Sequence, residues 1–323
     1  MPHLNRKNRT KNQHYVPRLH LRRFVGAQPK NMVWVYSKGQ LKARPSRVEE
    51  TGSRNNFYSI LSENGVYHDD IDEMLEKIEN LAAEPYRGLL SGSIPQGQRR
   101  ADFAMFLATA FSRSPAQIRA YAEAMARAWQ TELRVRTQTK AGFDDLIKGM
   151  DEAGIPIEDP ENLHSFIHDP SRYWLSVSEK RGLEAIGVAD DLAPILFARR
   201  WRVAVSPVPL VTSDNPLALL PTGMVGQIAA RSFRSPIATV TYPLSTSKLL
   251  VIEGKLGAVG SANMSVTEAE MQNAYRVANA EDLIFADRHD PALVEQVAAF
   301  AEFRPRIKIG HDFATDVEVK ITR

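Results

Sequence analysis

The apolar residues of this chain change their spacing twice, and this change constrains the fold more than any other feature of the sequence. From about residue 70 to residue 199 they recur mainly every three or four positions, which is typical of amphipathic helices. Before and after that stretch they form short runs flanked by turn residues, which is typical of strands. Helices in the middle and strands at both ends predict an α+β fold, not an alternating α/β fold. We expect a central, bundle-like helical core with antiparallel strands contributed by both the N- and C-terminal parts.

Residues at the ends of the helical stretches indicate where the helices begin and end. Acidic residues from Asp69 onward favour a helix that begins near residue 70, and Pro85 is expected to kink or end it. A second helix is predicted over residues 99–113. Ser114 as N-cap and Pro115 at the first helical position then predict a new helix. Further helices are expected over residues 173–187, 190–199, 265–278 and 291–301, with short helices at most in 137–172.

The strand predictions rest on β-branched and aromatic runs that alternate or stay apolar over four to seven residues. They cover residues 32–36, 41–44, 56–60, 201–205, 209–212, 237–242, 248–252, 283–285 and 315–321. We expect a flexible basic arm at residues 1–12 and a single α+β domain over 13–323. The alternative is a subdivision into 13–135 and 173–323 around the irregular segment 137–172.

The composition excludes several classes of protein. The 323 residues contain no cysteine, so disulfides, thiolate metal sites and a cysteine nucleophile are absent. The N-terminus is polar and basic, unlike a signal peptide, and no run of about 18 apolar residues occurs. These features predict a cytoplasmic protein with no membrane partner.

The charge is distributed unevenly along the chain. Residues 1–54 contain thirteen Lys/Arg and two acidic residues, a net charge of +11, so the remainder carries 3 − 11 = −8. Such a basic head favours contact with a polyanion, either nucleic acid or an acidic partner. It is equally consistent with a head that docks on the protein's own acidic body.

Familiar catalytic motifs do not occur in the sequence. It lacks the phosphate-binding Gly-x-x-x-x-Gly-Lys-Ser/Thr loop, the dinucleotide motif Gly-x-Gly-x-x-Gly and the Gly-x-Ser-x-Gly elbow. His164 and His168 have metal-ligand spacing, but Ser165 stands where a zincin needs Glu. Function must therefore be argued from single residues.

Two candidate residues lie in the helical part of the chain. Glu79 belongs to a series of glutamates on successive turns, which could hold a hard cation such as Mg²⁺ or simply be solvated. Arg113 falls in the break between two apolar helices, where a guanidinium can reach a phosphate or carboxylate. It could equally cap the carbonyl groups at the end of the first helix.

The other candidates lie near predicted strands. Asp214 and Asn215 follow an apolar run, where Asp214 could act as a base or a metal ligand, or the pair could stabilise a turn. His14 and Tyr15 combine a proton carrier of near-neutral pKa with neighbouring arginines, which suits phosphate chemistry. A role as a core plug is equally consistent with their position.

The segment His14-Tyr15-Val16-Pro17, followed by Leu and Phe, resembles the start of a bacterial family, domain of unknown function 4238. Further similar landmarks follow in order: Asn56-Phe57-Tyr58, Ile78-Glu79, Phe106 through Arg113-Ser114-Pro115, Ser213-Asp214-Asn215-Pro216 and Tyr242-Pro243-Leu244-Ser245. The resemblance implies a shared fold and supplies no activity.

If the landmarks converge in space, one pocket would contain His14, Tyr15, Glu79, Arg113, Asp214 and Asn215. This set suits hydrolysis of phosphodiesters or nucleotides, with Mg²⁺ at Glu79 and Asp214 as an option. We therefore expect a nucleic-acid- or nucleotide-directed hydrolase of a stress or defence system. The alternative is a non-catalytic binding or regulatory protein in which these residues form a structural polar network.

Overall fold

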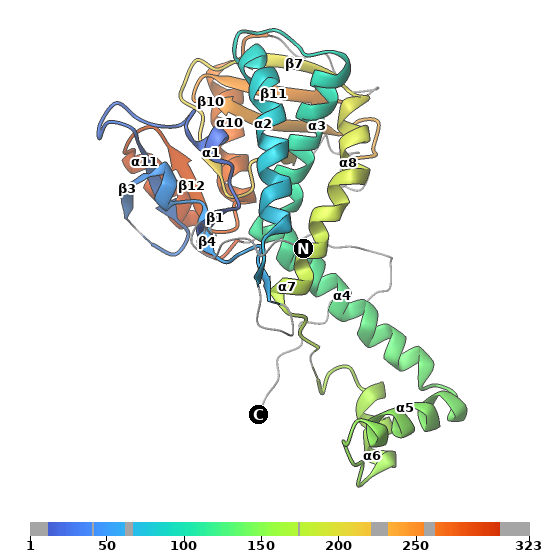
Figure 1. Ribbon diagram of the computed structural model, residues 1–323. Helices are drawn as coiled ribbons and strands as arrows, with labels where there is room; N and C mark the ends of the chain where they lie inside the picture. The colour runs from blue at the N-terminus through green and yellow to red at the C-terminus, as the bar shows by residue number, and fades with distance from the viewer. Residues whose placement is uncertain are drawn as a thin grey trace. The chain divides into compact units, whose positions relative to one another are not determined.

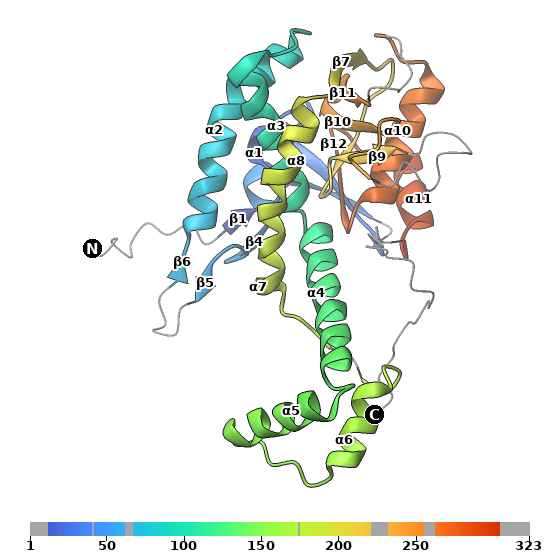
Figure 2. The same cartoon turned by 90° about the vertical axis from the view of Figure 1, so that its right-hand side faces the viewer.

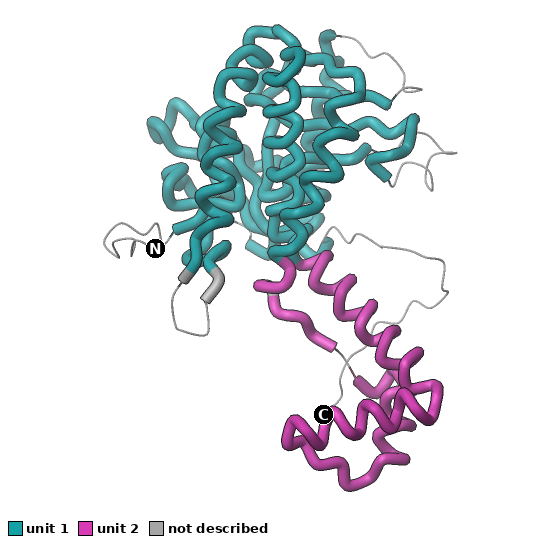
Figure 3. The backbone as a smooth tube through the Cα atoms, turned by 45° about the vertical axis from the view of Figure 1, so that its right-hand side comes forward, with its two compact units in different colours: residues 1–118, 183–306 teal, residues 119–182, 307–323 magenta. Residues whose placement is uncertain are grey.

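The computed structural model describes residues 12–40, 42–61, 67–173, 175–220, 232–254 and 262–303. The chain forms two compact units, which are coloured separately in Figure 3. Unit 1 comprises residues 1–118 and 183–306, and unit 2 comprises residues 119–182 and 307–323. The predicted basic arm, apart from Asn12, and the predicted strand at 315–321 lie outside the described residues.

The secondary structure changes type along the chain as the apolar spacing predicts. The N-terminal part contains β1 (Asn12–His14), α1 (Arg18–Leu21), β2 (Met32–Ser37), β3 (Ala43–Arg47), the 3₁₀ turn η2 (Val48–Glu50), β4 (Ser53–Asn55), β5 (Ile60–Leu61) and β6 (Tyr67–His68). The helical part contains α2 (Asp70–Leu90), α3 (Gly97–Ser112), α4 (Pro115–Arg136), α5 (Lys140–Glu152), α6 (Pro160–His168), α7 (Glu179–Gly182), η3 (Leu183–Gly187) and α8 (Val188–Phe197). The C-terminal part contains β7 (Arg200–Val205), β8 (Thr212–Ser213), β9 (Ala218–Leu220), β10 (Thr239–Ser245), β11 (Lys248–Glu253), α10 (Val266–Asn279), β12 (Leu283–Ala286) and α11 (Pro291–Ala299).

The first large sheet of unit 1 has the strand order β7-β11-β10-β9, and all its pairs are antiparallel. Alternation along β10 and β11 sends Tyr242 and Leu250 to one face and Leu249 and Val251 to the other. Helices α2, α3 and α8 cover the first face, and α10 covers the second (Figures 1 and 2). Both faces are therefore buried, which explains why β11 reads as a nearly continuous apolar run.

The main core lies between that sheet and helices α2, α3 and α8. Phe103 and Phe106 of α3 pack edge-on against Tyr86, Trp201 and Tyr242 at ring separations of 5.5–6.2 Å, and they lie 5.4 Å from each other. Replacing a fully buried phenylalanine such as Phe106 by alanine would cost about 3–5 kcal/mol.

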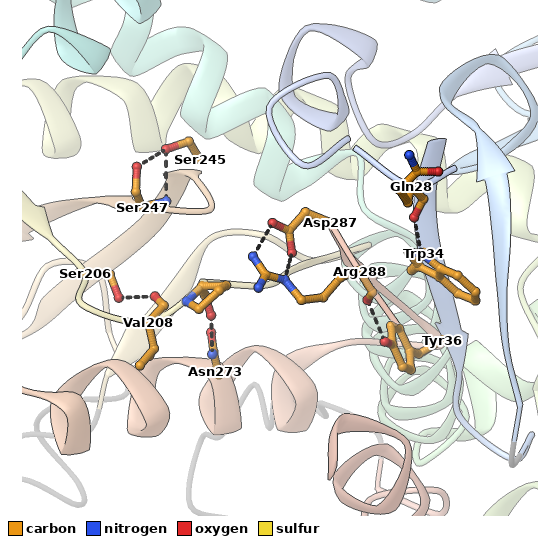
Figure 4. A network of polar contacts seen from close by, with 11 residues as sticks. Gln28, Trp34, Tyr36, Ser206, Val208, Ser245, Ser247, Asn273, Asp287 and Arg288 are labelled. Atoms are coloured by element: carbon orange, nitrogen blue, oxygen red, sulfur yellow. Dashed lines mark hydrogen bonds and ion pairs between the residues drawn. The ribbon is translucent and has the colours of Figure 1, made fainter. Parts of the chain in front are cut away.

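The second large sheet has the order β3-β2-β12-β8 and is also antiparallel. Val35 and Phe285 face one cluster, whereas Tyr36 and Ile284 face another that includes residues of α10 and α11. Tyr36 Oη donates to the Arg288 carbonyl at 2.9 Å and thereby ties β2 to the segment after β12 (Figure 4). The chain passes from β7 of the first sheet to β8 of the second and back to β9 of the first. It returns to the second sheet at β12, after β11 and α10.

These elements confirm the α+β fold. Among the described helices, none combines the length and apolar character that a bilayer crossing needs.

Several element predictions were wrong in detail. Residues 140–152 form a helix of 13 residues where short helices at most were predicted, and only Thr212 of the strand predicted at 209–212 belongs to a strand. Of the two outcomes expected at Pro85, a kink or an end, the helix does not end: α2 continues to Leu90, because the Pro85 ring is buried inside unit 1 and the helix tolerates one missing N–H. Residues 56–59 form a turn between two short strands, with Asn56 in the left-handed region at φ 53°. Residues 175–178 are not helical, so the helix predicted at 173–187 is confined to α7 and η3.

Unit 2 contains most of α4 together with α5 and α6. Asp159 caps α6 by accepting from Asn162 N at 3.0 Å, and Pro160 occupies the first turn. The ring centres of His164 and His168 lie 4.5 Å apart. His164 Nε2 lies 3.1 Å from the Thr137 carbonyl oxygen, and His168 Nε2 lies 3.1 Å from the Thr137 hydroxyl. The pair that has metal-ligand spacing thus forms hydrogen bonds within this unit.

Candidate functional site

His14 lies at the end of β1, in a short antiparallel strand pair of unit 1. Strand β1 pairs with β4, which places His14 opposite Ser53. The Gly52 carbonyl accepts hydrogen bonds from Tyr15 N and Val16 N at 2.9 and 3.0 Å. Gly52 has φ +65°, and a Cβ there would lie 3.1 Å from Val16, so this turn requires glycine.

The imidazole of His14 forms one hydrogen bond that defines its tautomer. Its Nε2 lies 3.1 Å from the Val48 carbonyl oxygen, which can only accept, so Nε2 carries the hydrogen. Burial lowers the pKa of His14 below its ordinary 6.5, although the bond to Val48 opposes this. A neutral imidazole of this tautomer leaves Nδ1 as a proton acceptor.

Arg113 and Glu79 form an ion pair whose two charges act on His14. Arg113 is the C-cap of α3 and is 1 % exposed, and its Nη2 lies 2.8 Å from Glu79 Oε1 on α2. Burial alone would lower the pKa of Arg113, but the Glu79 carboxylate more than offsets it and the pKa is raised. Both charges act on the pKa of His14, Glu79 raising it and Arg113 lowering it. Of the predicted site residues, Arg113 and Glu79 thus contact each other directly, and His14 lies within range of both charges.

A second set of polar residues ties this region to the start of α2. The Gln13 side chain accepts from Tyr58 N at 2.6 Å and donates to Ser59 Oγ at 3.0 Å. Ser59 in turn donates to Asp69 Oδ1 at 2.5 Å. Burial, and after it the neighbouring Asp69 carboxylate, raises the pKa of Asp72 in the first turn of α2. The acidic end of α2 is thus partly desolvated where it meets β1.

Tyr15 is a core residue. It is 5 % exposed and packs edge-on against Phe57 at 5.6 Å, with the Arg54 guanidinium 5.7 Å from its ring centre. Burial raises its pKa, and Asp214 raises it further. The phenol is therefore uncharged at neutral pH and contributes packing.

Asp214 is buried and holds the turn before β12. Its two carboxylate oxygens accept from the backbone N–H groups of Glu281, Asp282 and Leu283, each at 2.8 Å. Burial raises the pKa of Asp214 to about 6, against the three hydrogen bonds, which lower it. Asp214 is not among the charges that act on the pKa of His14.

Asn215 follows Asp214 directly after β8. Its amide group donates to the Asn279 carbonyl at 3.0 Å at the end of α10, and its backbone N–H contacts Ser213 Oγ at 3.3 Å. Asp214 and Asn215 are thus engaged in hydrogen bonds that fix β8 against α10 and β12. Among the described residues, no three His, Asp or Glu side chains converge as a metal site requires.

His20, to which the sequence assigned no role, sits at the centre of unit 1. Its Nδ1 lies 3.0 Å from Tyr86 Oη, and its Nε2 lies 2.7 Å from Thr212 Oγ1. Tyr86 Oη donates to the Leu244 carbonyl at 2.9 Å, so it accepts from His20 Nδ1–H, and in neutral His20 the Thr212 hydroxyl donates to Nε2. Burial lowers the pKa of His20 to about 3. The sequence signal for a buried His20 was its position between Leu19 and Leu21.

A basic groove opens beside His14. It encloses about 540 Å³ and is lined by Arg22, Val25, Lys30, Asn31, Met32, Arg47, Val48 and Glu49. Arg22 contacts Glu49 at 3.6 Å with both side chains exposed, whereas Lys30 and Arg47 form no ion pair with a described carboxylate. Val48 joins the two features, because it lines the groove and accepts the His14 hydrogen bond.

Comparison with known families gives one match. A family model described as protein of unknown function (DUF4238) matches residues 12–290. The chain belongs to this family. No curated protein and no solved structure matches the chain. The DUF4238 assignment confirms the suspected family and leaves the activity to be argued from the site.

Proposed function

We propose that this DUF4238 protein binds nucleic acid in the basic groove and hydrolyses a phosphodiester bond with His14 as general base. The observation that carries the proposal is the shared residue Val48. A phosphate backbone that contacts Lys30 and Arg47 lies next to the residue that orients the His14 imidazole. Binding and chemistry would then occupy adjacent parts of one surface.

The charge of the groove supports nucleic acid as the substrate class. Lys30 and Arg47 are exposed, and no described carboxylate neutralises them. The same holds for Arg18 and Arg44, which belong to the same basic head. These cations are therefore available for phosphate groups, which Lys and Arg neutralise with release of counterions.

The chemistry follows from the protonation states. Neutral His14 would take a proton from water at Nδ1, while the water oxygen attacks phosphorus and the ester P–O bond breaks. The protonated imidazole then returns the proton to the leaving oxygen. Arg113, fixed by Glu79, supplies positive charge near the phosphorane. Mg²⁺ remains an optional participant at Glu79, so each assay includes an arm with the metal and an arm with a chelator.

The test measures cleavage of DNA, RNA and nucleotides by the purified chain, with Mg²⁺ or with a chelator. His14→Ala should lower the rate by about 10²–10⁴-fold, because it removes the general base. A groove variant, Lys30→Ser with Arg47→Ser, should weaken binding and reduce the slope of log affinity against log salt by about 2. If all substrates stay intact under both conditions, the hydrolase proposal is wrong.

A second candidate function is non-catalytic binding, with the motif residues in a structural role. Asp214 favours it, because its carboxylate accepts three backbone N–H groups and so holds a turn. Asp214→Asn replaces a carboxylate oxygen with an amide that cannot accept from a backbone N–H. We expect a loss of about 1–3 kcal/mol in the free energy of unfolding, measured by urea denaturation. Under the hydrolase proposal this variant keeps the cleavage rate at temperatures where it is folded. A rate loss equal to that of His14→Ala would instead assign Asp214 to the reaction.

A further inference from the structure

Among the described buried cations of unit 1, Arg276 is the one with two guanidinium nitrogens that have no hydrogen-bond partner. It lies in the last turn of α10 and is 1 % exposed. Its Nη2 donates to Thr241 Oγ1 at 2.7 Å, but Nε and Nη1 have no acceptor. No described carboxylate forms an ion pair with it.

Other buried cations of the same unit donate several hydrogen bonds to backbone carbonyl groups. Lys38 donates to the carbonyl oxygens of Ala278, Ala280 and Phe303 at 2.7–3.2 Å. Arg199 donates to the carbonyl oxygens of Ala238 at 2.6 Å and Ser235 at 2.7 Å. Backbone carbonyl groups thus accept several hydrogen bonds from each of these two cations, whereas Arg276 has no such acceptor at Nε and Nη1.

An uncompensated buried charge costs several kcal/mol, and buried donors without acceptors are rare in folded proteins. Loss of the proton does not remove this cost at neutral pH, because burial lowers the pKa of Arg276 only to about 9. A negatively charged or strongly accepting group at Nε and Nη1 would offset it.

A second buried cation acts on the same region. Arg113 is also 1 % exposed, and its Nε has no acceptor once Nη2 has bonded to Glu79. The charges of both arginines act on His20 and on Tyr242, whose rings lie 4.7 Å apart. His20 is neutral, so two cations and one carboxylate leave one positive charge in excess around this ring pair.

We infer that the interior of unit 1 binds a small oxyanion, of the size and charge of inorganic phosphate, at the guanidinium of Arg276. The free donors are one N–H on Nε and two on Nη1, on two different nitrogens. A tetrahedral oxyanion has acceptor oxygens in several directions and can meet them together, while its charge neutralises the excess. The inference does not depend on hydrolysis at His14.

The test uses the whole chain and inorganic phosphate as the probe. Thermal unfolding is followed as phosphate replaces chloride at constant ionic strength, and binding heat is measured by calorimetry. A ligand of the folded state alone raises the melting temperature steadily with the logarithm of its concentration. We expect this rise in the wild type. No shift and no binding heat would overturn the inference and leave ordered water as the partner of Arg276.

Three variants assign the effect to its site. Arg276→Met should abolish the phosphate-dependent shift, and Arg276→Lys, which keeps the charge but not the fork of donors, should weaken phosphate binding by at least about 10-fold. Arg199→Met should keep the shift, because that guanidinium is already satisfied. The groove variant Lys30→Ser with Arg47→Ser should also keep it. A shift lost in the groove variant and kept in Arg276→Lys would place the phosphate on the surface and overturn the inference.

Adenosine monophosphate separates a closed phosphate site from a nucleotide site. Arg276 is buried, so the side chains around it must move to admit any anion, and a nucleotide requires a much larger displacement than phosphate does; we therefore expect no shift with this probe in the groove variant. A shift as large as that of phosphate would contradict a site of phosphate size.

Discussion

His20 shows how one buried side chain couples stability to pH. In the folded chain it is neutral, because Tyr86 accepts from Nδ1 and Thr212 donates to Nε2. Its pKa falls from 6.5 to about 3 on burial, so between these values the unfolded chain binds a proton that the folded chain does not. The contribution of neutral His20 to the free energy of unfolding is therefore complete above pH 6.5 and is lost as the pH falls toward 3.

This difference predicts the pH dependence of a His20→Gln variant. The stability advantage of the wild type over the variant should shrink by about 1.4 kcal/mol per pH unit below 6.5. The measurement is urea denaturation of both proteins from pH 7.5 to pH 4.5. His14 and Asp214 titrate in both proteins, so their contributions cancel in the difference. Thr212→Val keeps the imidazole and should keep the wild-type slope, whereas parallel curves for wild type and His20→Gln would refute a neutral, buried His20.

At the scale of single residues, the sequence singles out candidate residues only where the signal is local. His14 was singled out by its neighbouring arginines and Arg113 by the break between two helices, which are both local signals, and their part in a reaction stays a prediction. Asp214 finds its partners about 67 residues later, at Glu281 and beyond, and Arg276 sits in an ordinary amphipathic helix. Spacing along the chain holds no information about such tertiary partners.

At the scale of single elements, local chemistry predicts most boundaries. Ser114 accepts from Gln117 N at 3.4 Å at the start of α4, as a serine N-cap should. The failure at Pro85 has the opposite origin, because packing of the buried ring in unit 1 outweighs the local preference to end the helix. Where tertiary contacts oppose a local rule, the sequence pattern alone misplaces the boundary.

The capping box of α10 gives an element-scale prediction. Ser265 Oγ accepts from Glu268 N at 3.2 Å, and the Glu268 carboxylate accepts from Ser265 N at 2.7 Å. Ser265→Ala should lower the free energy of unfolding by about 1 kcal/mol, as measured by urea denaturation. Ser265→Asn, which can still accept from Glu268 N, should recover most of the loss. Equal losses in both variants would mean that the cap does not stabilise α10.

The division into two units gives the prediction for the whole molecule. The groove, the His14 region and Arg276 all belong to unit 1. The two ends of the inserted segment 119–182 also meet there, since Ile118 and Leu183 pack in the same hydrophobic cluster. The sequence indicated an irregular segment at 137–172 but not these boundaries, because α4 runs without a break from one unit into the other.

Replacing residues 119–182 by a short Gly/Ser linker should therefore leave unit 1 folded, because its sheets and its main core remain complete and the joined ends belong to one hydrophobic cluster, beside the contact of Ser112 with the Ile186 carbonyl. We expect a single cooperative thermal transition, followed by circular dichroism, and retention of the phosphate-dependent rise in melting temperature. A matched chain that carries the same deletion together with Arg276→Met should unfold cooperatively but show no phosphate response. A broad, non-cooperative transition of the deletion chain would show instead that unit 1 needs the inserted segment to complete its packing.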